Sequence, residues 1–460
     1  MTHDTDTIAG ISTAAGVGAI AIVRVSGPEC LRIADMLFRS SRGRPSNWPA
    51  RMFGHGRVIG QDGEILDEAI LLVMRAPHSY TREDVVEFQI HGGSVSARRV
   101  LKAVLQAGAR IADPGEFTKR AFLNGRMDLL QAEAVMDLIS ASSERAASMA
   151  AEQLTGSLSL RISGLYEELL SVAADLEAFL DFIEDEIPES LVPEIQNRLK
   201  NIAGELTHLL ETWNEGRIIR EGALVVISGK PNVGKSTLMN ALLGHDRAIV
   251  SPYPGTTRDF IEETVVIEGF PIRLVDTAGL RNADCEIERQ GIARAMAIIN
   301  KADLHLHVMD ASACSTTVFE DDHILQHIVN DKLVIVMNKK DLLSEPITKS
   351  TIHSGKTVYI SALHHEGLDD LKNHIIEFLH LTKASSQPSA LISERHASSI
   401  SSTLNCINKS IDILMHEKEL GYVPAVIHIR QATEHIGNVI GRTYDMDLLN
   451  SVFSRFCIGK

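Results

Sequence analysis

The feature that most constrains this chain is the segment Gly229-Lys230-Pro231-Asn232-Val233-Gly234-Lys235-Ser236, which fits the pattern G-x-x-x-x-G-K-[ST]. It follows the apolar run 224–228 and precedes a helical pattern, which is the order of strand, loop and helix that a phosphate-binding loop requires. Backbone N–H groups of such a loop surround phosphate oxygens at a helix N-terminus. Lys235 would contact the β- and γ-phosphates, and the Ser236 hydroxyl would bind Mg²⁺.

Further segments follow in the order expected of a guanine-nucleotide site. Thr257, in the pair Thr256-Thr257, can supply a second Mg²⁺ ligand, and Asp276 in Asp276-Thr277-Ala278-Gly279 can hold a metal-bound water. The carboxylate of Asp341 can accept from N1–H and the exocyclic amine of guanine, a pair of donors that adenine lacks. We therefore predict a GTPase. Its expected nucleotide contacts are Asn232, Val233, Gly234, Lys235, Ser236, Thr237, Ser251, Thr256, Thr257, Asp276, Thr277, Ala278, Gly279, Asn338, Lys339, Asp341, Ser361, Ala362 and Leu363.

The position that usually orients the attacking water holds an unsuitable residue in this chain. Ras-like proteins place a Gln directly after D-x-x-G, whereas this chain has Leu280, which cannot hold a water. The carboxylates just downstream are Asp284, Glu286 and Glu288, and any of them could replace the Gln. The side-chain carbonyl of Asn232 suits an additional monovalent cation, which would neutralise charge in the transition state.

The pattern of elements predicts a multidomain α/β and α architecture. Strands expected at 224–228, 272–275, 304–309, 333–337 and 358–360 alternate with helices, which predicts a Ras-like, doubly wound and mostly parallel sheet. The first 120 residues read as α+β, with strands at 19–25 and 69–73 and a helix at 94–106.

Long helices are predicted on both sides of the α/β part. One should run from Leu154 to Leu180, and a second from Ile195 to Trp213 with Gly216 closing it. After the Ser-rich stretch 384–389, helices are expected over 391–418 and 424–456. We therefore predict an N-terminal domain (1–120), a helical domain (121–217 with 384–460) and a G domain (218–383) inserted into it.

Charge and composition exclude several classes. The net charge is −15, divided into +2 for residues 1–120, −12 for 121–217, −5 for 218–383 and 0 for 384–460. This charge distribution does not favour broad, non-specific nucleic-acid binding. A nucleic-acid substrate would therefore dock at residues 1–120 or through a partner protein. No apolar run reaches the ~20 residues that span a bilayer. The start has no leader pattern, and the five cysteines are scattered, so we expect a cytoplasmic protein without structural zinc.

Three other patterns favour structural explanations. The match to G-x-G-x-x-[GA] at 16–21 precedes a strand, whereas a dinucleotide site needs a strand before the glycines and a helix after them. His305 and His307 share one face of a strand without further ligands, which favours a packed or half-exposed pair over a metal site. The acidic run Glu184-Asp185-Glu186 favours a solvated helix end over a metal site.

The chain as a whole resembles the MnmE (TrmE) family of bacterial tRNA-modification GTPases, in the TrmE-Era-EngA-like group. The G motifs are shared with many GTPases, whereas the N-terminal segments and the Cys-Ile-Gly-Lys end are specific. The segments that carry the resemblance are 6–9, 22–27, 83–87, 91–93, 114–124, 255–259, 276–281 and 456–460.

The resemblance implies a folate-binding N-terminal domain that also forms the homodimer. It implies that a one-carbon unit from 5-formyl- or 5,10-methylene-tetrahydrofolate is used on the wobble uridine of tRNA, with an FAD-containing partner, MnmG, in a heterotetramer. The products would be 5-carboxymethylaminomethyl or 5-aminomethyl uridine. The folate contacts would be Arg24, Glu87, Arg126 and Lys460, with Arg126 standing where other members have Lys.

The resemblance also implies roles around the nucleotide. Asn232 and carbonyls of Ser251, Tyr253 and Thr256 would hold K⁺, Glu288 would orient the attacking water, and the G domains would dimerise head to head. Cys457 would be either a catalytic thiol or a small residue near the folate pocket, and the sequence shows no activation of its thiol.

Two other functional classes remain as alternatives. A ribosome-assembly GTPase would share the Asn-bearing P-loop but usually carries a basic RNA-binding domain, whereas residues 384–460 are neutral and helical. A membrane-remodelling GTPase would need a basic or apolar amphipathic surface, whereas the long-helix segment here is strongly acidic. The modification enzyme is therefore the favoured hypothesis.

Overall fold

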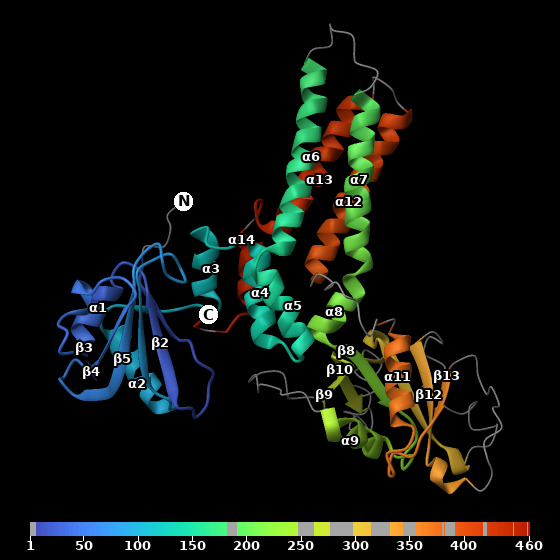
Figure 1. Cartoon of the computed structure of the whole chain (residues 1–460), viewed down its shortest axis with the longest axis horizontal. Coiled ribbons are helices and arrows are strands. Elements are labelled where there is room, and N and C mark those ends of the chain that lie inside the picture. Colours follow the sequence, from blue (N-terminus) through green and yellow to red (C-terminus); the bar gives the residue numbers. More distant parts are fainter. Residues whose placement is uncertain are drawn as a thin grey trace, which may run out of the picture. The chain divides into compact units, whose positions relative to one another are not determined.

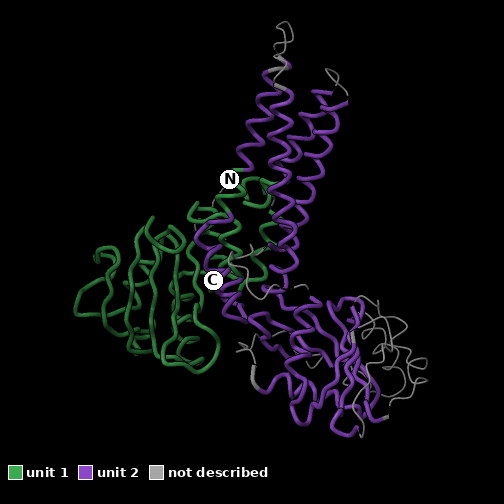
Figure 2. Tube along the Cα trace, turned by 45° about the vertical axis from the view of Figure 1, so that its right-hand side comes forward, with its two compact units in different colours: residues 1–136, 159–164, 436–460 green, residues 137–158, 165–435 purple. Residues whose placement is uncertain are grey.

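The computed structural model describes residues 6–181, 191–246, 262–276, 298–313, 332–343, 356–379, 381, 392–416, 421–444, 446–457 and 459–460. Contacts divide the chain into two compact units (Figure 2). One comprises residues 1–136, 159–164 and 436–460, and the other residues 137–158 and 165–435. The predicted domain boundaries near residues 120, 217 and 383 stay a prediction.

The first unit is built on a seven-stranded sheet in the order β3-β4-β5-β6-β2-β1-β7 (Figure 1). All neighbouring strands are antiparallel except β1 and β7. Because side chains alternate along a strand, β2 turns Val23 and Val25 into the core and Arg24 to the opposite, outer face. The strands are β1 Ile8–Ile11, β2 Ile20–Ser26, β3 Phe38–Arg39, β4 Met52–Ile59, β5 Ile65–Met74, β6 Val85–His91 and β7 Arg110–Ile111.

Two helices, α1 (Cys30–Leu37) and α2 (Ser94–Gln106), pack on the core face of this sheet. A second cluster joins α3 (Glu116–Leu123), the start of α4 (Leu129–Ser140) and α14 (Met446–Phe453) through Phe122, Leu129 and Phe453. The predicted single helix over 424–456 is wrong. It is split after α13 (Tyr422–Ile440) by Gly441, whose left-handed backbone ends a helix.

The second unit contains α5 (Glu144–Leu154), most of α6 (Ser157–Asp181), α7 (Leu191–Glu211), α8 (Trp213–Glu221) and α12 (Glu394–His416). In α7, Arg198 pairs with Glu168 and Asp175 of α6, and α7 packs against α12. Helices before and after the G domain therefore pack together, as an inserted domain requires (Figure 1).

The predicted helix ends in this unit were partly wrong. Leu154 ends α5 instead of starting the long helix, which begins at Ser157. Gly216 lies inside α8, and Gly222 closes that helix with a φ of 81°. A glycine ends a helix where the backbone must turn left-handed, and the sequence does not show which glycine does so.

The six-stranded sheet of the second unit has the order β13-β12-β11-β8-β10-β9. All neighbours are parallel except β9 and β10, so the doubly wound G-domain fold is confirmed. The antiparallel β9 was not predicted, because its first half, Glu262-Glu263-Thr264, is polar. The elements are β8 Ala223–Ser228, α9 Lys235–Asp246, β9 Glu262–Ile267, β10 Phe270–Asp276, β11 Leu304–Asp310, β12 Leu333–Asn338, β13 Lys356–Tyr359 and α11 Leu368–Phe378, with short 3-10 turns η1 Pro45–Asn47, η3 Ala311–Ala313 and η7 Lys340–Leu342.

The structure tests two expectations from the sequence, a dinucleotide site and a membrane-spanning helix. The glycines Gly16 and Gly18 connect β1 to the antiparallel β2, so a strand precedes them after all, but no helix follows and a dinucleotide site is excluded. Within the described residues, no helix is both long enough and apolar enough to cross a membrane.

Candidate functional site

The loop between β8 and α9 has the backbone geometry of a phosphate cradle. Gly229 has a φ of 140°, and a Cβ there would lie 2.2 Å from the carbonyl oxygen of Val308. A Cβ at Gly234 would lie 2.3 Å from Nδ2 of Asn338. Only glycine therefore allows this loop to lie so close to β11 and β12, as the P-loop prediction requires.

Lys235 is buried at the start of α9, and its ammonium group is held by the loop itself. Nζ donates to the carbonyl oxygens of Gly229, at 3.0 Å, and Lys230, at 2.8 Å. These bonds hold the positive charge inside the curve of the loop. Phosphate oxygens at the helix N-terminus would therefore meet both the backbone N–H groups and this ammonium.

Asn338, at the end of β12, joins the P-loop to the base pocket. Its Nδ2 donates to the carbonyl of Val233 at 2.9 Å, and its Oδ1 accepts from the N–H of Ala362 at 3.0 Å. The residue is 3% exposed, so both bonds are shielded from water. Asn338 thus sets the position of the phosphate loop relative to the loop that would hold the base.

The carboxylate of Asp341 lies beside the Ser361 loop. A hydrogen bond from the Ser361 side chain lowers the pKa of Asp341, so the group is anionic at neutral pH. Lys339 has a left-handed backbone and pairs with Asp310 at 2.6 Å. An anionic acceptor in this place suits the two donors of guanine, in agreement with the sequence prediction.

Two side chains of the predicted Mg²⁺ site meet at the other end of the P-loop: Ser236, the predicted ligand, and Asp276, which was expected to hold a metal-bound water. The Ser236 hydroxyl lies 3.4 Å from Oδ2 of Asp276, the last residue of β10. A hydroxyl and a carboxylate at this spacing fit Mg²⁺, which prefers oxygen ligands and retains several waters. The predicted ligand Thr257 lies outside the described residues, as do Ser251, Tyr253, Thr256, Thr277, Ala278, Gly279, Leu280 and Glu288.

Two buried histidines adjoin the P-loop strand. His307 lies within 3.1 Å of the Ser228 hydroxyl on β8 through Nδ1, and burial lowers the pKa of His305 to about 4. Both are at most 2% exposed, so the pair is packed and not half-exposed. Among the described residues no cluster of His, Cys, Asp and Glu could hold a metal, and 184–186 lie outside them.

The G-domain sheet also meets α5 and α8 inside the second unit. Arg145 of α5 lies 4.4 Å from the centre of the Phe270 ring and pairs with Glu215 of α8 at 2.5 Å. Ala146, Met149, Ile218 and Ile219 extend the apolar core of the sheet into these helices. The strand β10 therefore runs from this junction to Asp276 at the nucleotide site.

A second candidate site lies on the outer face of the first unit's sheet. Arg24 pairs with Glu87 across β2 and β6 at 2.8 Å, and both side chains are largely buried. The guanidinium carbons of Arg24 and Arg126 lie 5.2 and 4.6 Å from the centre of the Tyr80 ring. The structure thus brings two of the four predicted folate residues, Arg24 and Arg126, to one aromatic ring, and a third, Glu87, to Arg24.

Tyr80 and Phe117 were missed by the sequence analysis. Phe117 lies 5.6 Å from the guanidinium carbon of Arg24, and the Tyr80 hydroxyl hydrogen-bonds the Thr118 side chain at 2.9 Å. Phe117 belongs to the segment 114–124 that carries the resemblance, but aromatic residues are so often core that no signal marked either as part of a site.

The fourth predicted folate residue reaches the same place from far along the chain. Burial and the nearby positive charge of Arg24 lower the pKa of Lys460. Ser12 donates to the carbonyl of Gly459 at 2.8 Å, and Gly115 donates to the carbonyl of Cys457 at 3.3 Å. The Cys457 side chain is half-buried.

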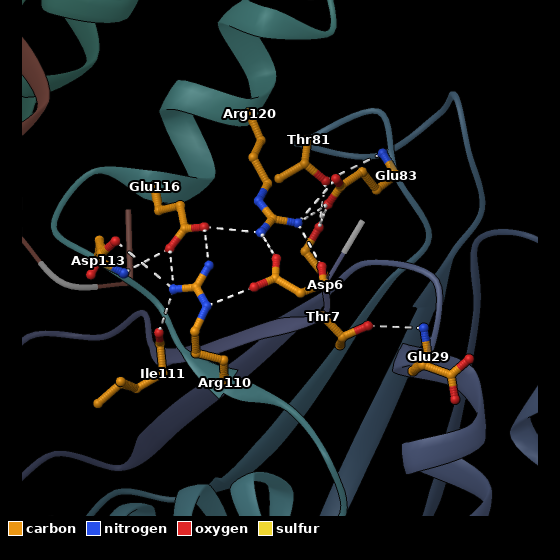
Figure 3. A network of polar contacts seen from close by, with 11 residues as sticks. Asp6, Thr7, Glu29, Thr81, Glu83, Arg110, Ile111, Asp113, Glu116 and Arg120 are labelled. Atoms are coloured by element: carbon orange, nitrogen blue, oxygen red, sulfur yellow. Dashed lines mark hydrogen bonds and ion pairs between the residues drawn. The ribbon is translucent and has the colours of Figure 1, made fainter. Parts of the chain in front are cut away.

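A network of charges supports the sheet next to this site (Figure 3). Arg120 is 6% exposed and pairs with Asp6, Glu83 and Glu116, while Arg110 joins Asp6 and Glu116. Burial raises the pKa of Glu116, but hydrogen bonds and charge from Arg110 and Arg120 outweigh it, so the pKa is lowered overall. The network fixes the start of α3, which carries Phe117.

Comparisons with known proteins cover the whole chain. A family model described as "MnmE helical domain" matches residues 129–457, and one described as "GTP-binding protein TrmE N-terminus" matches residues 7–126. A tRNA modification GTPase MnmE from Alkaliphilus oremlandii is 39% identical over 462 residues, and one from Geobacter sulfurreducens is 42% identical over 463. Each alignment covers 99% of both chains. The similarity thus includes the P-loop region and the N-terminal sheet.

Proposed function

Because the chain belongs to the MnmE family of tRNA modification GTPases, we propose that it hydrolyses GTP at the P-loop and that this hydrolysis serves the modification of tRNA. The observation that carries the proposal is the double hydrogen bond of Asn338, which joins the P-loop at Val233 to the loop at Ala362. Asp341, three residues after Asn338, is the group proposed to bind guanine. Such a pocket selects GTP over ATP, because a bound adenine would leave the carboxylate unpaired.

In this proposal each P-loop side chain has a distinct role. Lys235 exchanges its bonds to the Gly229 and Lys230 carbonyls for oxygens of the β- and γ-phosphates. Ser236 and Thr257 hold Mg²⁺, which offsets the negative charge of the phosphates. Asn232, with carbonyls of Ser251, Tyr253 and Thr256, holds K⁺, which stimulates hydrolysis by adding positive charge near the phosphates. Glu288 orients the water, and two G domains meet around the nucleotides.

The site around Tyr80 is proposed to bind tetrahydrofolate as its 5-formyl or 5,10-methylene derivative. The pterin ring carries N–H groups that can donate hydrogen bonds to the carboxylate of Glu87. The aromatic rings of Tyr80 and Phe117 offer flat surfaces against which the pterin can pack. The carboxylates of the folate tail suit the positive charges of Arg24, Arg126 and Lys460. The one-carbon unit would supply the new methylene carbon on the wobble uridine, and the FAD-containing partner would supply the redox equivalents. Ammonium as the nitrogen donor would give 5-aminomethyl uridine, and glycine would give 5-carboxymethylaminomethyl uridine.

The part of this sheet face over β2 and β5, which excludes β3 and β4 at the edge of the sheet, is proposed as the homodimer contact. It exposes the apolar side chains of Ile20 and Ile70, which are 60% and 41% exposed. Large apolar side chains grouped on one face favour burial by a second protein surface. The dimer would join an FAD-containing MnmG-type partner in a heterotetramer that acts in the cytoplasm.

The proposal is tested by mass spectrometry of tRNA nucleosides from a strain lacking the protein. We expect the 5-aminomethyl-type uridines to disappear and to return when the intact gene is restored. Lys235→Ala should fail to restore them, because it removes the ammonium that contacts the phosphates. Lys301→Ala is the matched control, since Lys301 is exposed and lies outside the predicted nucleotide contacts, and this variant should restore them.

An unchanged nucleoside profile in the deletion strain would remove the modification function. A guanine-specific GTPase would remain, and a ribosome-assembly switch would become the leading explanation. Restoration by Lys235→Ala would show instead that modification does not need GTP hydrolysis at this loop.

A further inference from the structure

We propose that an arginine-rich edge of the N-terminal sheet binds the phosphate backbone of tRNA. The arginine edge is defined as Arg39, Arg42, Arg44, Arg51 and Arg57, on β3, β4 and the segment between them. The strand β3 is the outermost strand of the sheet (Figure 1). This inference rests on the tRNA-modifying role proposed above and adds the surface that the substrate contacts.

The local composition departs sharply from that of the whole chain. Residues 36–61 contain these five arginines and His55 but no Asp or Glu, although the chain contains 60 acidic residues and has a net charge of −15. All five arginine side chains are exposed. An acidic protein thus keeps one stretch free of carboxylates, which leaves a local positive potential there.

The arginines of this edge also differ from other arginines of the same unit in their ion pairs with carboxylates. Among the described residues, no ion pair joins any of the five to a carboxylate; Arg39 donates only to the carbonyls of Asp35 and Phe38. Elsewhere in the unit arginines do pair with acids: Arg24, Arg32, Arg75, Arg99, Arg110 and Arg120. The five charges are therefore available to an external anion.

The strand register places two of these charges opposite each other. Arg39 of β3 pairs directly with Arg57 of β4 in the antiparallel register. Like charges at directly opposite positions destabilise a strand pair, by roughly 0.2–1 kcal/mol on the scale of such pairs. Glu68, the cross-strand neighbour of Arg57 on β5, is within 3.3 Å of His55 instead. A bound phosphate between the two guanidinium groups would remove the repulsion.

A folded RNA suits this surface better than a small anion does. The arginines follow one another along an edge and a loop, so they can contact successive phosphates, each contact releasing condensed counterions. Residues 121–217 carry a net charge of −12 and would repel a polyanion. The arginine edge is then the part of the chain that a tRNA can approach. Its arginines would recognise the phosphate backbone and the shape of the tRNA more than its base sequence.

The test compares two double variants of the full chain. Arg42→Gln with Arg57→Gln removes two charges of the arginine edge. Arg98→Gln with Lys102→Gln removes two charges from the exposed face of α2 in the same unit, where the described contacts include no acidic partner. The affinity of each protein for a labelled tRNA transcript is measured by fluorescence anisotropy over a series of salt concentrations.

We expect the Arg42/Arg57 variant to bind tRNA about tenfold more weakly at ~0.1 M salt, and the slope of log affinity against log salt to fall by roughly 1.4–1.8. The control should bind as the unmodified chain does. GTP hydrolysis of both variants should match the unmodified chain, and neither variant should unfold at a lower temperature than the unmodified chain, which separates a binding defect from a folding defect.

Equal weakening in both variants would overturn the proposal, because net charge alone would then explain it. Unchanged binding in the Arg42/Arg57 variant would overturn it as well, as would failure of the unmodified chain to bind tRNA. These outcomes are distinct from failure of the proposed function, which is judged by the nucleoside profile of the deletion strain.

Discussion

Asn338 shows how much of a motif's role depends on partners that a sequence does not name. The motif predicted a nucleotide contact, and the structure uses both ends of its amide within the protein, for Val233 and for Ala362. The residue type follows from the motif, because an amide carries its donor and its acceptor on two separate atoms at the end of one short side chain. The identity of its two partners follows from the tertiary fold.

The residues around Tyr80 show where sequence reasoning ends at this scale. Arg24, Glu87, Arg126 and Lys460 were expected only from a family resemblance, since no spacing links residues so far apart. Tyr80 was not expected at all, because an isolated aromatic residue has no pattern that distinguishes a site from a core. Such a site is assembled by strand pairing, as with Arg24 and Glu87 across β2 and β6.

At the residue scale we predict that Glu116→Gln destabilises the protein at neutral pH and much less in acid. The pKa of Glu116 is below its usual value of 4.5 in the folded state. Its stabilising effect is therefore present above that value and is lost as the pH falls through the folded pKa. Urea unfolding should show a loss of about 1–2 kcal/mol at pH 7, discounted for partial exposure.

Glu64→Gln serves as the control, because Glu64 pairs with Arg99 at the surface and such pairs contribute little. The difference between Glu116→Gln and the unmodified chain should shrink near pH 4. An equal loss at both pH values would contradict an ionic role for Glu116.

At the scale of elements, the interiors of helices and strands were easier to predict than their ends. Apolar periodicity placed β8, β11, β12 and α2 correctly, because a buried face requires apolar residues at regular spacing along the sequence. It failed at Gly216 and Gly222, since both glycines permit a turn and the packing of α8 against the G domain decides which is used. The polar start of β9 hid that strand, because an edge strand need not be apolar throughout.

The junction at Phe270 gives a prediction for a single element contact. Arg145→Ala removes both the ion pair with Glu215 and the contact with the aromatic ring, each at a largely buried position. We expect the free energy of unfolding to fall by about 1–2 kcal/mol, measured by urea unfolding. Lys200→Ala, at an exposed position of α7, is the matched control and should have little effect.

Hydrogen exchange can show whether the loss is local. Amides of β10 should exchange faster in Arg145→Ala than in the unmodified chain, because Phe270 begins that strand. Unchanged exchange in β10 together with unchanged stability would mean that Arg145 does not hold α5 against the sheet.

At the scale of the molecule, the first unit draws on three separate stretches of the chain. The sequence indicated an inserted G domain from the order of helix and strand patterns, and this architecture is confirmed. The patterns of helix and strand did not indicate that residues 436–460 would pack with the N-terminal sheet; only the family resemblance implied a contact there, through Lys460 and Cys457 at the folate pocket. That contact depends on a short run, Cys457 to Lys460, whose composition carries no periodic signal.

The whole-molecule prediction concerns this long-range contact. Lys460→Gln should weaken binding of 5-formyl-tetrahydrofolate by about tenfold, because it removes a partly buried positive charge beside Arg24. Lys119→Gln is the control, since Lys119 contacts only Asn450 at the surface. Calorimetric titration of both variants measures the effect, and equal affinities would place the folate away from Lys460.

The bond between Ser12 and Gly459 joins residues 447 positions apart. During translation the N-terminal sheet leaves the ribosome long before Gly459 is made, so its pocket stays open on one side while the G domain is still being synthesised. A nascent or truncated chain can acquire its P-loop without acquiring its second pocket. The site around Tyr80 is therefore complete only in a chain that has been translated as far as Lys460.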